Sequence, residues 1–257
     1  FSGLLELLDP VRFTQVTEFN EQEVIRIKDI MVRRLKREIN TKDDQLDKPR
    51  RFAERYLKPL PLYFSREEKD LSKAVEKFRA AVKKAIANCS KSEKLAGAFA
   101  VEVLSKRLLS CPYTFSDSWS RFKIGYSNDD AAELTDVTAA KRAQEADSDD
   151  DREREERTNH ASQTVGAWLK PLAGGISHEI NQVDSALDQL RLTRRNDQEP
   201  TPKSDSRLER LYELIDSLLR RDRNWLDNER LIVFTEYKTT LDYLQKNLLG
   251  KYSDDHE

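Results

Sequence analysis

The sequence predicts a mainly α-helical fold with isolated extended segments and one β-α unit near its end. Three observations lead to this prediction. The 257 residues include only seven glycines and eight prolines, fewer than a loop-rich β protein usually contains. Long stretches repeat apolar side chains every three or four positions, the period of an amphipathic helix. The continuous apolar run Leu231–Phe234 is typical of a strand buried on both faces, and a helical pattern follows it directly.

The composition is that of a heavily charged chain with modest core material. Charged residues make up 36% and hydrophobic residues 37% of the chain, against typical values of about 25% and 45–50%. The net charge of −2 does not indicate a nucleic-acid partner, although basic clusters and an acidic block are separated along the sequence. No apolar run approaches the roughly 18 residues of a membrane span, and no signal peptide is visible.

Two further features of the sequence indicate its cellular location and its relation to a longer protein. Cys89 and Cys111 lack metal-ligand spacing, which favours a reduced, intracellular protein, and we expect a cytoplasmic location without membrane contact. The sequence starts with Phe1 rather than Met, so we expect a piece of a longer protein.

The first 40 residues are predicted to hold two helices. A short one from Gly3 to Leu8 ends at Asp9-Pro10, since the residue before proline avoids the helical region. Asn20 has the character of an N-cap, and the helix that it opens is expected to run to about Ile39. Basic side chains cover the polar faces of this helix: Arg26, Lys28, Arg33, Arg34, Lys36 and Arg37.

Residues 41–127 are predicted to lead into a helical subdomain. A polar loop is followed by the proline-interrupted segment 51–64, an edge strand or an extended connector. Ser65 and Glu68 form a capping box that opens a helix over 66–88. We expect Ser92 to cap the next helix, Pro112 to break it, and a third helix around 116–123.

Residues 128–160 have almost no large apolar side chains, so this acidic segment is either a solvated helix or a disordered linker. Disorder is favoured at 147–151, where like charges repel. Helices are expected again over 165–192 and after a capping box at 206–209. The last predicted helix follows the apolar run and carries Leu241, Leu244 and Leu248 on one face.

Most catalytic motifs are absent from the sequence. It contains no G-x-x-x-x-G-K-[ST] phosphate loop, no G-x-S-x-G and no cysteine-rich metal site. "LAGGISHEINQ" is similar to the phosphoacceptor box of sensor histidine kinases, with His178 as the acceptor. That box usually continues with Asn-Pro, whereas Gln182 follows Asn181 here, which favours an ordinary surface or bundle histidine.

Two stretches are more specific than their periodicities. "SGLLELLDPVRF" with "IKDIMVRRLKREI" near the start, and "SDSRLERLYELI" with "ERLIVFTEYKTTLDYLQKNL" near the end, resemble SWI/SNF-related superfamily-two helicase-like ATPases. The bacterial DNA translocases, which carry long helical insertions between their lobes, are the most similar branch. The Arg33-Arg34-Leu35-Lys36 text matches a signature that closes the first RecA-like lobe of this family.

The resemblance implies a domain organisation. Residues 1–40 would end the first RecA-like lobe, and 41–195 would form a helical inter-lobe insertion with the acidic linker at 128–160. Residues 196–257 would start the second RecA-like lobe, including helicase motif IV. Leu231–Phe234 would then be the first strand of an incomplete α/β lobe. In this chain we expect it to be unpaired, or to be covered by the helices or by another copy of the chain.

The function implied for the full-length parent is ATP hydrolysis coupled to movement along DNA, with ATP and Mg²⁺ as cofactors. The phosphate-loop lysine, the Asp-Glu metal motif and the second-lobe arginine motif lie outside these residues. Because phosphoryl transfer needs them, the chain alone is expected to be inactive, and we assign it no catalytic, cofactor-binding or metal-binding residue.

The resemblance also implies which residues meet the nucleic acid. Thr235, Tyr237 and Lys238 follow the motif IV strand, where hydroxyl and ammonium groups suit phosphate contacts that do not read sequence. The signature residues Arg33, Arg34 and Lys36 either contact phosphate or brace the lobe interface. The expected partners are therefore DNA, bound weakly and in a salt-sensitive way, and other protein subunits through the helical insertion.

A non-enzymatic alternative stays open at this point. Capped amphipathic helices and an acidic linker also suit a helical interaction module that docks a partner protein. This alternative leaves the signatures at the two ends of the chain unexplained.

Overall fold

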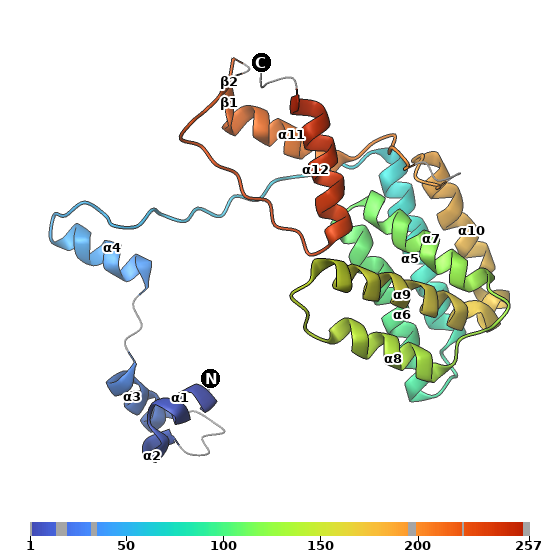
Figure 1. Cartoon of the computed structure of the whole chain (residues 1–257), viewed down its shortest axis with the longest axis horizontal. Helices are drawn as coiled ribbons and strands as arrows, with labels where there is room; N and C mark the ends of the chain where they lie inside the picture. Colours follow the sequence, from blue (N-terminus) through green and yellow to red (C-terminus); the bar gives the residue numbers. More distant parts are fainter. Residues whose placement is uncertain (1, 14–19, 32–34, 195–198, 223, 254–257) are drawn as a thin grey trace. The chain divides into compact units, whose positions relative to one another are not determined.

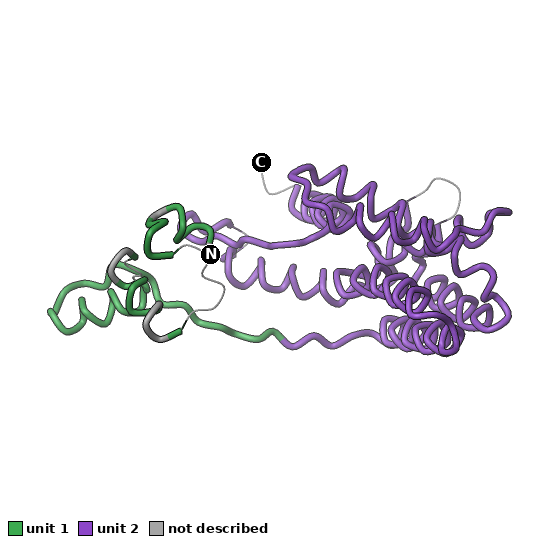
Figure 2. The backbone as a smooth tube through the Cα atoms, turned by 90° about the horizontal axis from the view of Figure 1, so that it is seen from below, with its two compact units in different colours: residues 1–60 green, residues 61–257 purple. Residues whose placement is uncertain are grey.

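The computed structural model describes residues 2–13, 20–31, 35–194, 199–222 and 224–253. They fall into two compact units, residues 1–60 and 61–257 (Figure 2). The described part of the chain is mainly helical, as predicted, and its one sheet has two strands. None of the described helices combines the length and the apolar character needed to cross a bilayer.

The described residues of the first unit form four short helices. The helix predicted to run from Asn20 to about Ile39 is instead two helices, and residues 32–34 between them lie outside the described residues. Asp43, in the last turn of the fourth helix, accepts two hydrogen bonds of 2.8 Å from Arg51 in the loop that follows. The helices are α1 (Ser2–Leu8), α2 (Pro10–Phe13), α3 (Glu21–Ile30) and α4 (Lys36–Gln45).

The second unit is a group of packed helices (Figure 1). Its elements are α5 (Arg66–Ala85), α6 (Lys91–Ser110), α7 (Pro112–Ser127), α8 (Leu134–Glu145), α9 (Asp151–Leu169), the 3-10 helix η1 (Lys170–Leu172), α10 (Ala173–Gln189), α11 (Ser206–Leu218), β1 (Arg220–Arg221), β2 (Asn224–Trp225) and α12 (Lys238–Tyr252).

The predicted helix starts are partly confirmed. The capping box at Ser65 is present: Glu68 N–H donates to the Ser65 hydroxyl at 3.2 Å, and Ser65 N–H donates to the Glu68 carboxylate at 2.8 Å. The prediction that Ser92 caps the next helix is wrong. Ser90 caps α6, because its hydroxyl accepts from Glu93 N–H at 3.3 Å, and Ser92 lies inside the first turn.

Two other helix starts differ from the predictions. Pro112 does not simply break a helix: it occupies the first position of α7, where its missing N–H costs nothing. The cap of α11 is Asp205 rather than Ser206, since an Asp205 carboxylate oxygen accepts from Arg207 N–H at 3.1 Å and Leu208 N–H at 3.0 Å. Ser206 N–H instead donates to Glu68 at 3.0 Å, which links the starts of α5 and α11.

The core of the second unit lies among α5, α6, α7, α9 and α10. Its centre is an aromatic cluster on α5 and α7. Trp119 lies with its ring centroid 5.2 Å from that of Phe78 and 4.8 Å from that of Phe122. The Trp119 indole N–H donates to Asp184 of α10 at 2.7 Å, so its polar atom is satisfied at the edge of the core.

The acidic segment is helical over most of its length. The structure places α8 and the first half of α9 within 128–160, and residues 146–150 between them lie outside any helix. Of the residues 147–151, where disorder is favoured, only Asp151 lies in a helix; α9 begins there, with the Asp150 carboxylate accepting from Arg152 N–H at 2.8 Å. Like charges at a helix start are tolerated because they face the positive end of the helix dipole.

Extended segments in the described chain remain outside the sheet. Residues 51–64 and 231–234 belong to no described strand, and the sheet is a hairpin that pairs Arg220 with Trp225. Ile232 and Phe234 are 73% and 90% exposed. Among the described residues no strand pairs with the apolar run, and of the predicted β-α unit only the helix, α12, is formed.

Candidate functional site

The structure brings three of the six predicted contact residues together. Thr235 and Tyr237 lie in the segment that leads into α12, and Lys238 is the first residue of that helix. Lys36 belongs to the other unit, where its ammonium lies 5.6 Å from the centroid of the Phe52 ring. Arg33 and Arg34 lie outside the described residues.

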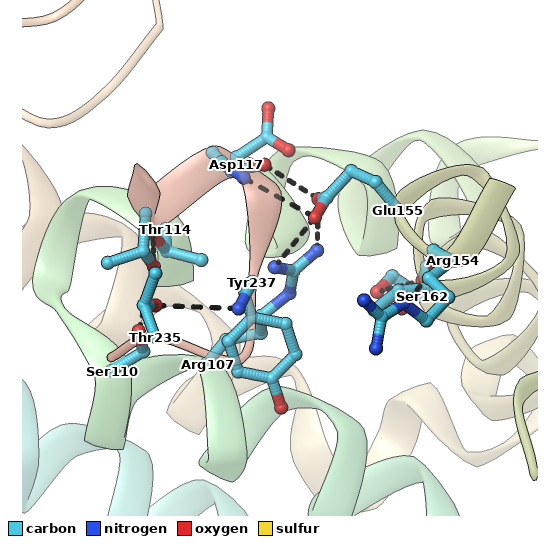
Figure 3. A network of polar contacts seen from close by, with 12 residues as sticks. Arg107, Ser110, Thr114, Asp117, Arg154, Glu155, Ser162, Thr235 and Tyr237 are labelled. Atoms are coloured by element: carbon cyan, nitrogen blue, oxygen red, sulfur yellow. Dashed lines mark hydrogen bonds and ion pairs between the residues drawn. The ribbon is translucent and has the colours of Figure 1, made fainter. Parts of the chain in front are cut away.

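The ring of Tyr237 packs against the guanidinium of a buried arginine. The guanidinium carbon of Arg107, on α6, lies 4.3 Å from the centroid of the Tyr237 ring, and the Arg107 side chain is fully buried (Figure 3). Glu155, on α9, neutralises this charge through an ion pair, and Arg107 Nη1 donates to it at 3.3 Å. A buried guanidinium without such a partner would be strongly unfavourable, so Glu155 is essential to this arrangement.

The same carboxylate reaches the start of α12. The Thr239 hydroxyl donates to Glu155 at 2.7 Å, and Thr239 N–H lies 3.5 Å from the other carboxylate oxygen. A negative charge at the first turn of a helix is favourable because it faces the unpaired backbone N–H groups. Glu155 thus holds α6, α9 and α12 together.

Hydroxyl groups extend this contact. The Thr240 hydroxyl lies 2.7 Å from both the Ser110 and the Thr114 hydroxyls, and these contacts join α12 to α6 and α7. The Thr114 hydroxyl lies 3.0 Å from the sulfur of Cys111, and burial raises the pKa of that thiol, which therefore stays neutral. We call the set Arg107, Glu155, Tyr237, Thr239 and Thr240 the α12 joint.

The residues predicted to contact phosphate form hydrogen bonds and an ion pair within the chain. The Lys238 ammonium lies 2.6 and 2.7 Å from the two carboxylate oxygens of Asp242, one helical turn on. The Thr235 hydroxyl accepts a 3.4 Å hydrogen bond from Tyr237 N–H. Burial, and then the charge of Glu236, raise the pKa of Tyr237, so its phenol is neutral. A phosphate bound by Lys238 would compete with Asp242.

A groove of about 520 Å³ lies beside the joint. The exposed apolar run supplies Val233 and Phe234 to its lining, and α6 and α11 supply Lys106 and Arg207. The Arg207 guanidinium also lies 5.0 Å from the centroid of the Phe64 ring. Asp205 and Glu236 also line the groove, which therefore combines apolar side chains with two cationic and two acidic ones.

Sequence reasoning missed Arg107, Glu155 and Thr239. Arg107 lies one turn after Val103 and Leu104 on the predicted apolar face of its helix, and a charged residue at that position could have signalled a buried ion pair. Glu155 gave no such signal, since it is one of many carboxylates in an acidic block. Among the described residues, no group of three histidine, cysteine or acidic side chains gathers as a metal site.

Comparisons with protein-family models, with curated proteins and with solved structures found no match to this chain.

Proposed function

We propose that this chain is the inter-lobe segment of an ATP-dependent DNA translocase. In this proposal the helical unit couples two RecA-like lobes, and the turn before α12 contacts the DNA backbone. The support is the sequence resemblance at both ends together with one structural observation, the exposed apolar run that precedes α12.

The apolar run carries the proposal. Leu231 to Phe234 are all exposed, in a chain whose residues are 36% charged. Leaving such side chains in water costs about 25 cal/mol per Å² of apolar surface, so exposed clusters usually mark a surface that another part covers. A parallel sheet of a second lobe would cover both faces of this run, and α12 would follow it as the first crossover helix.

The α12 joint supplies the coupling. Arg107 and Glu155 fix the start of α12 to α6 and α9 through buried charges, so α12 cannot shift without disturbing the helical unit. A lobe built on the apolar run would therefore transmit its rotation to the helices through this joint.

The DNA contacts in this proposal are to phosphate. Hydroxyl and cationic groups such as those of Thr235, Lys238 and Lys36 suit phosphate contacts, which position a protein without selecting a sequence. In the proposal Arg33 and Arg34, which lie outside the described residues, would add to these contacts. ATP and Mg²⁺ would be held by residues outside this chain and would supply the energy of movement.

The proposal is tested by ATP hydrolysis. A longer chain that includes the flanking sequence is expected to hydrolyse ATP faster with duplex DNA than without it, and the 257-residue chain alone is expected to be inactive. In the longer chain, Glu155→Gln is expected to reduce the stimulation by DNA more than the hydrolysis without DNA. A longer chain that hydrolyses no ATP with duplex DNA would contradict the proposal.

A further inference from the structure

A second groove of the helical unit, apart from the α12 joint, is lined by small apolar and basic side chains. A groove of about 960 Å³ runs between the end of α5 and the start of α6. Its apolar lining consists of small or short side chains, with Ala80 and Ala87 on one wall and Ala98 and Val101 on the other. These residues are exposed or partly exposed, so the groove is open along its length.

Close packing beneath the groove forms its floor. Ile86 is 6% exposed and lies against Gly97: a Cβ added at Gly97 would come within 2.3 Å of the Ile86 side chain. Ile86 therefore occupies the space that a side chain at position 97 would need, and it forms the apolar floor of the groove. The apolar side chains of the two walls above it are no larger than valine, which lets another backbone approach closely.

Cations surround this apolar strip. Arg79, Lys83, Lys84 and Lys94 line the groove together with one carboxylate, that of Glu76. Glu76 is paired with Arg79 at 2.8 Å, and no ion pair joins Lys83, Lys84 or Lys94 to any described residue. Three exposed ammonium groups beside an apolar strip therefore face solvent without a compensating charge.

We propose that this groove docks an acidic amphipathic helix of a partner protein. A third helix lying between two others buries a narrow apolar stripe, and the small lining residues allow it to approach at helix-packing distance. Carboxylates beside that stripe would meet Lys83, Lys84 and Lys94, which fixes the direction and the specificity of binding. This inference does not depend on the proposed translocase function.

Other anionic ligands fit the groove less well. It contains no aromatic side chain on which a base could stack, and phosphates would leave the apolar walls uncovered. An anionic lipid surface is flat, whereas the apolar residues lie between two helices and the cations lie along the rim. The groove thus matches a cylinder with one apolar stripe and acidic flanks.

Binding of stapled helical peptides to the 257-residue chain tests the inference. The panel has alanine or leucine at i, i+4 and i+7 with glutamate on both flanks, and its controls are scrambled peptides of the same composition and peptides with lysine in place of glutamate. We expect binding by acidic amphipathic members, at least tenfold tighter than by either control and weaker at high salt, measured by fluorescence anisotropy.

Matched variants locate the site. Lys83→Glu with Lys94→Glu, and separately Ala98→Trp, are expected to weaken binding at least tenfold. Lys69→Glu with Lys77→Glu makes the same charge change on exposed positions of α5 outside the groove, and is expected to change binding less than twofold.

Four results would overturn the inference: no panel member binds; the scrambled peptides bind equally well; the groove and control variants weaken binding alike; or duplex DNA or phosphatidylglycerol vesicles bind the groove more tightly than the peptides. Circular dichroism of each variant checks that the helices remain folded, and Ala98→Trp replaces an exposed side chain that the fold does not need.

Discussion

Helix α9 and the run Leu231–Phe234 reverse the usual relation between hydrophobicity and burial. The second half of α9 consists mostly of residues with small or polar side chains, yet Ala161, Ser162 and Val165 have no exposed surface. Leu231–Phe234 is the continuous apolar run of the sequence, yet all four side chains are exposed. The comparison shows that burial depends on which partners the rest of the chain offers.

Close approach explains the burial of α9. A Cβ added at Gly166 would lie 2.0 Å from the carbonyl oxygen of Phe122, and one added at Gly125 would lie 1.8 Å from that of Gln163. The backbones of α7 and α9 therefore touch where these glycines face each other. Small side chains are required at such a crossing, whereas the side chains of the apolar run, two of which line an open groove, stay exposed.

The largest effect on stability is expected when a side chain is added where the backbones of α7 and α9 touch. Gly166→Ala places a methyl group against backbone atoms that cannot rotate away, so α7 and α9 must separate. We expect the free energy of unfolding in urea to fall by about 3 kcal/mol. Gly174→Ala, in α10, is the control, because nothing lies within 4 Å of its added Cβ. Equal stability of the two variants would show that the helices do not touch at Gly166.

The second prediction concerns the α12 joint. Glu155→Ala leaves the buried Arg107 guanidinium without its counter-charge, and we expect a loss of about 2 kcal/mol in urea unfolding. Glu153→Ala, on the same helix, removes an ion pair to Arg157 that is partly exposed, and is expected to cost at most about 0.5 kcal/mol. A Glu155 variant as stable as the Glu153 variant would mean that the joint does not hold α12.

The third prediction uses another buried polar group, Glu68. Burial alone would raise its pKa, but hydrogen bonds from Ser206 and Ser65 hold it below its ordinary value of 4.5. The carboxylate therefore favours the folded state above about pH 4.5, and this contribution is lost as pH falls through the lower folded pKa. Glu68→Gln should reduce the free energy of unfolding by about 1 kcal/mol at pH 7 and change it less at pH 3.

Urea unfolding at the two pH values measures this difference. Glu93→Gln alters the capping box of α6, whose backbone hydrogen bond to Glu93 is exposed, and serves as the control. If Glu68→Gln lowers stability equally at both pH values, the ionised carboxylate is not what links α5 to α11.

The smallest effect on the free energy of unfolding is expected from a substitution in the exposed run Leu231–Phe234. Phe234 is 90% exposed, so Phe234→Ser should change the free energy of unfolding by less than about 0.5 kcal/mol in this chain. Phe115 is fully buried, and Phe115→Ala should cost about 3 kcal/mol or more. A large loss from Phe234→Ser would mean that the apolar run packs against the chain.

Sequence patterns correctly predicted several features that depend on local periodicity, among them helices and one of their caps. Helices at 66–85 and 206–218 followed from apolar stripes and caps, and the Ser65 box was correct. For the first half of α9 the sequence left a solvated helix and a disordered linker open, and the burial of the helix was not predicted because its glycine and alanine residues carry no hydrophobic signal. The α12 joint was missed because Glu155 and Thr239 lie far apart in sequence, and only the folded chain brings them to Arg107.

Backbone hydrogen exchange at Leu231–Phe234, compared with Ala161–Ala167, tests the central claim most directly. In the 257-residue chain the amides of α9 should be strongly protected, and those of the apolar run should exchange as fast as in an open coil. In the longer chain with the flanking sequence, the apolar run should become protected as it enters a sheet. Protection of the run in the 257-residue chain, or fast exchange in both chains, would contradict the account.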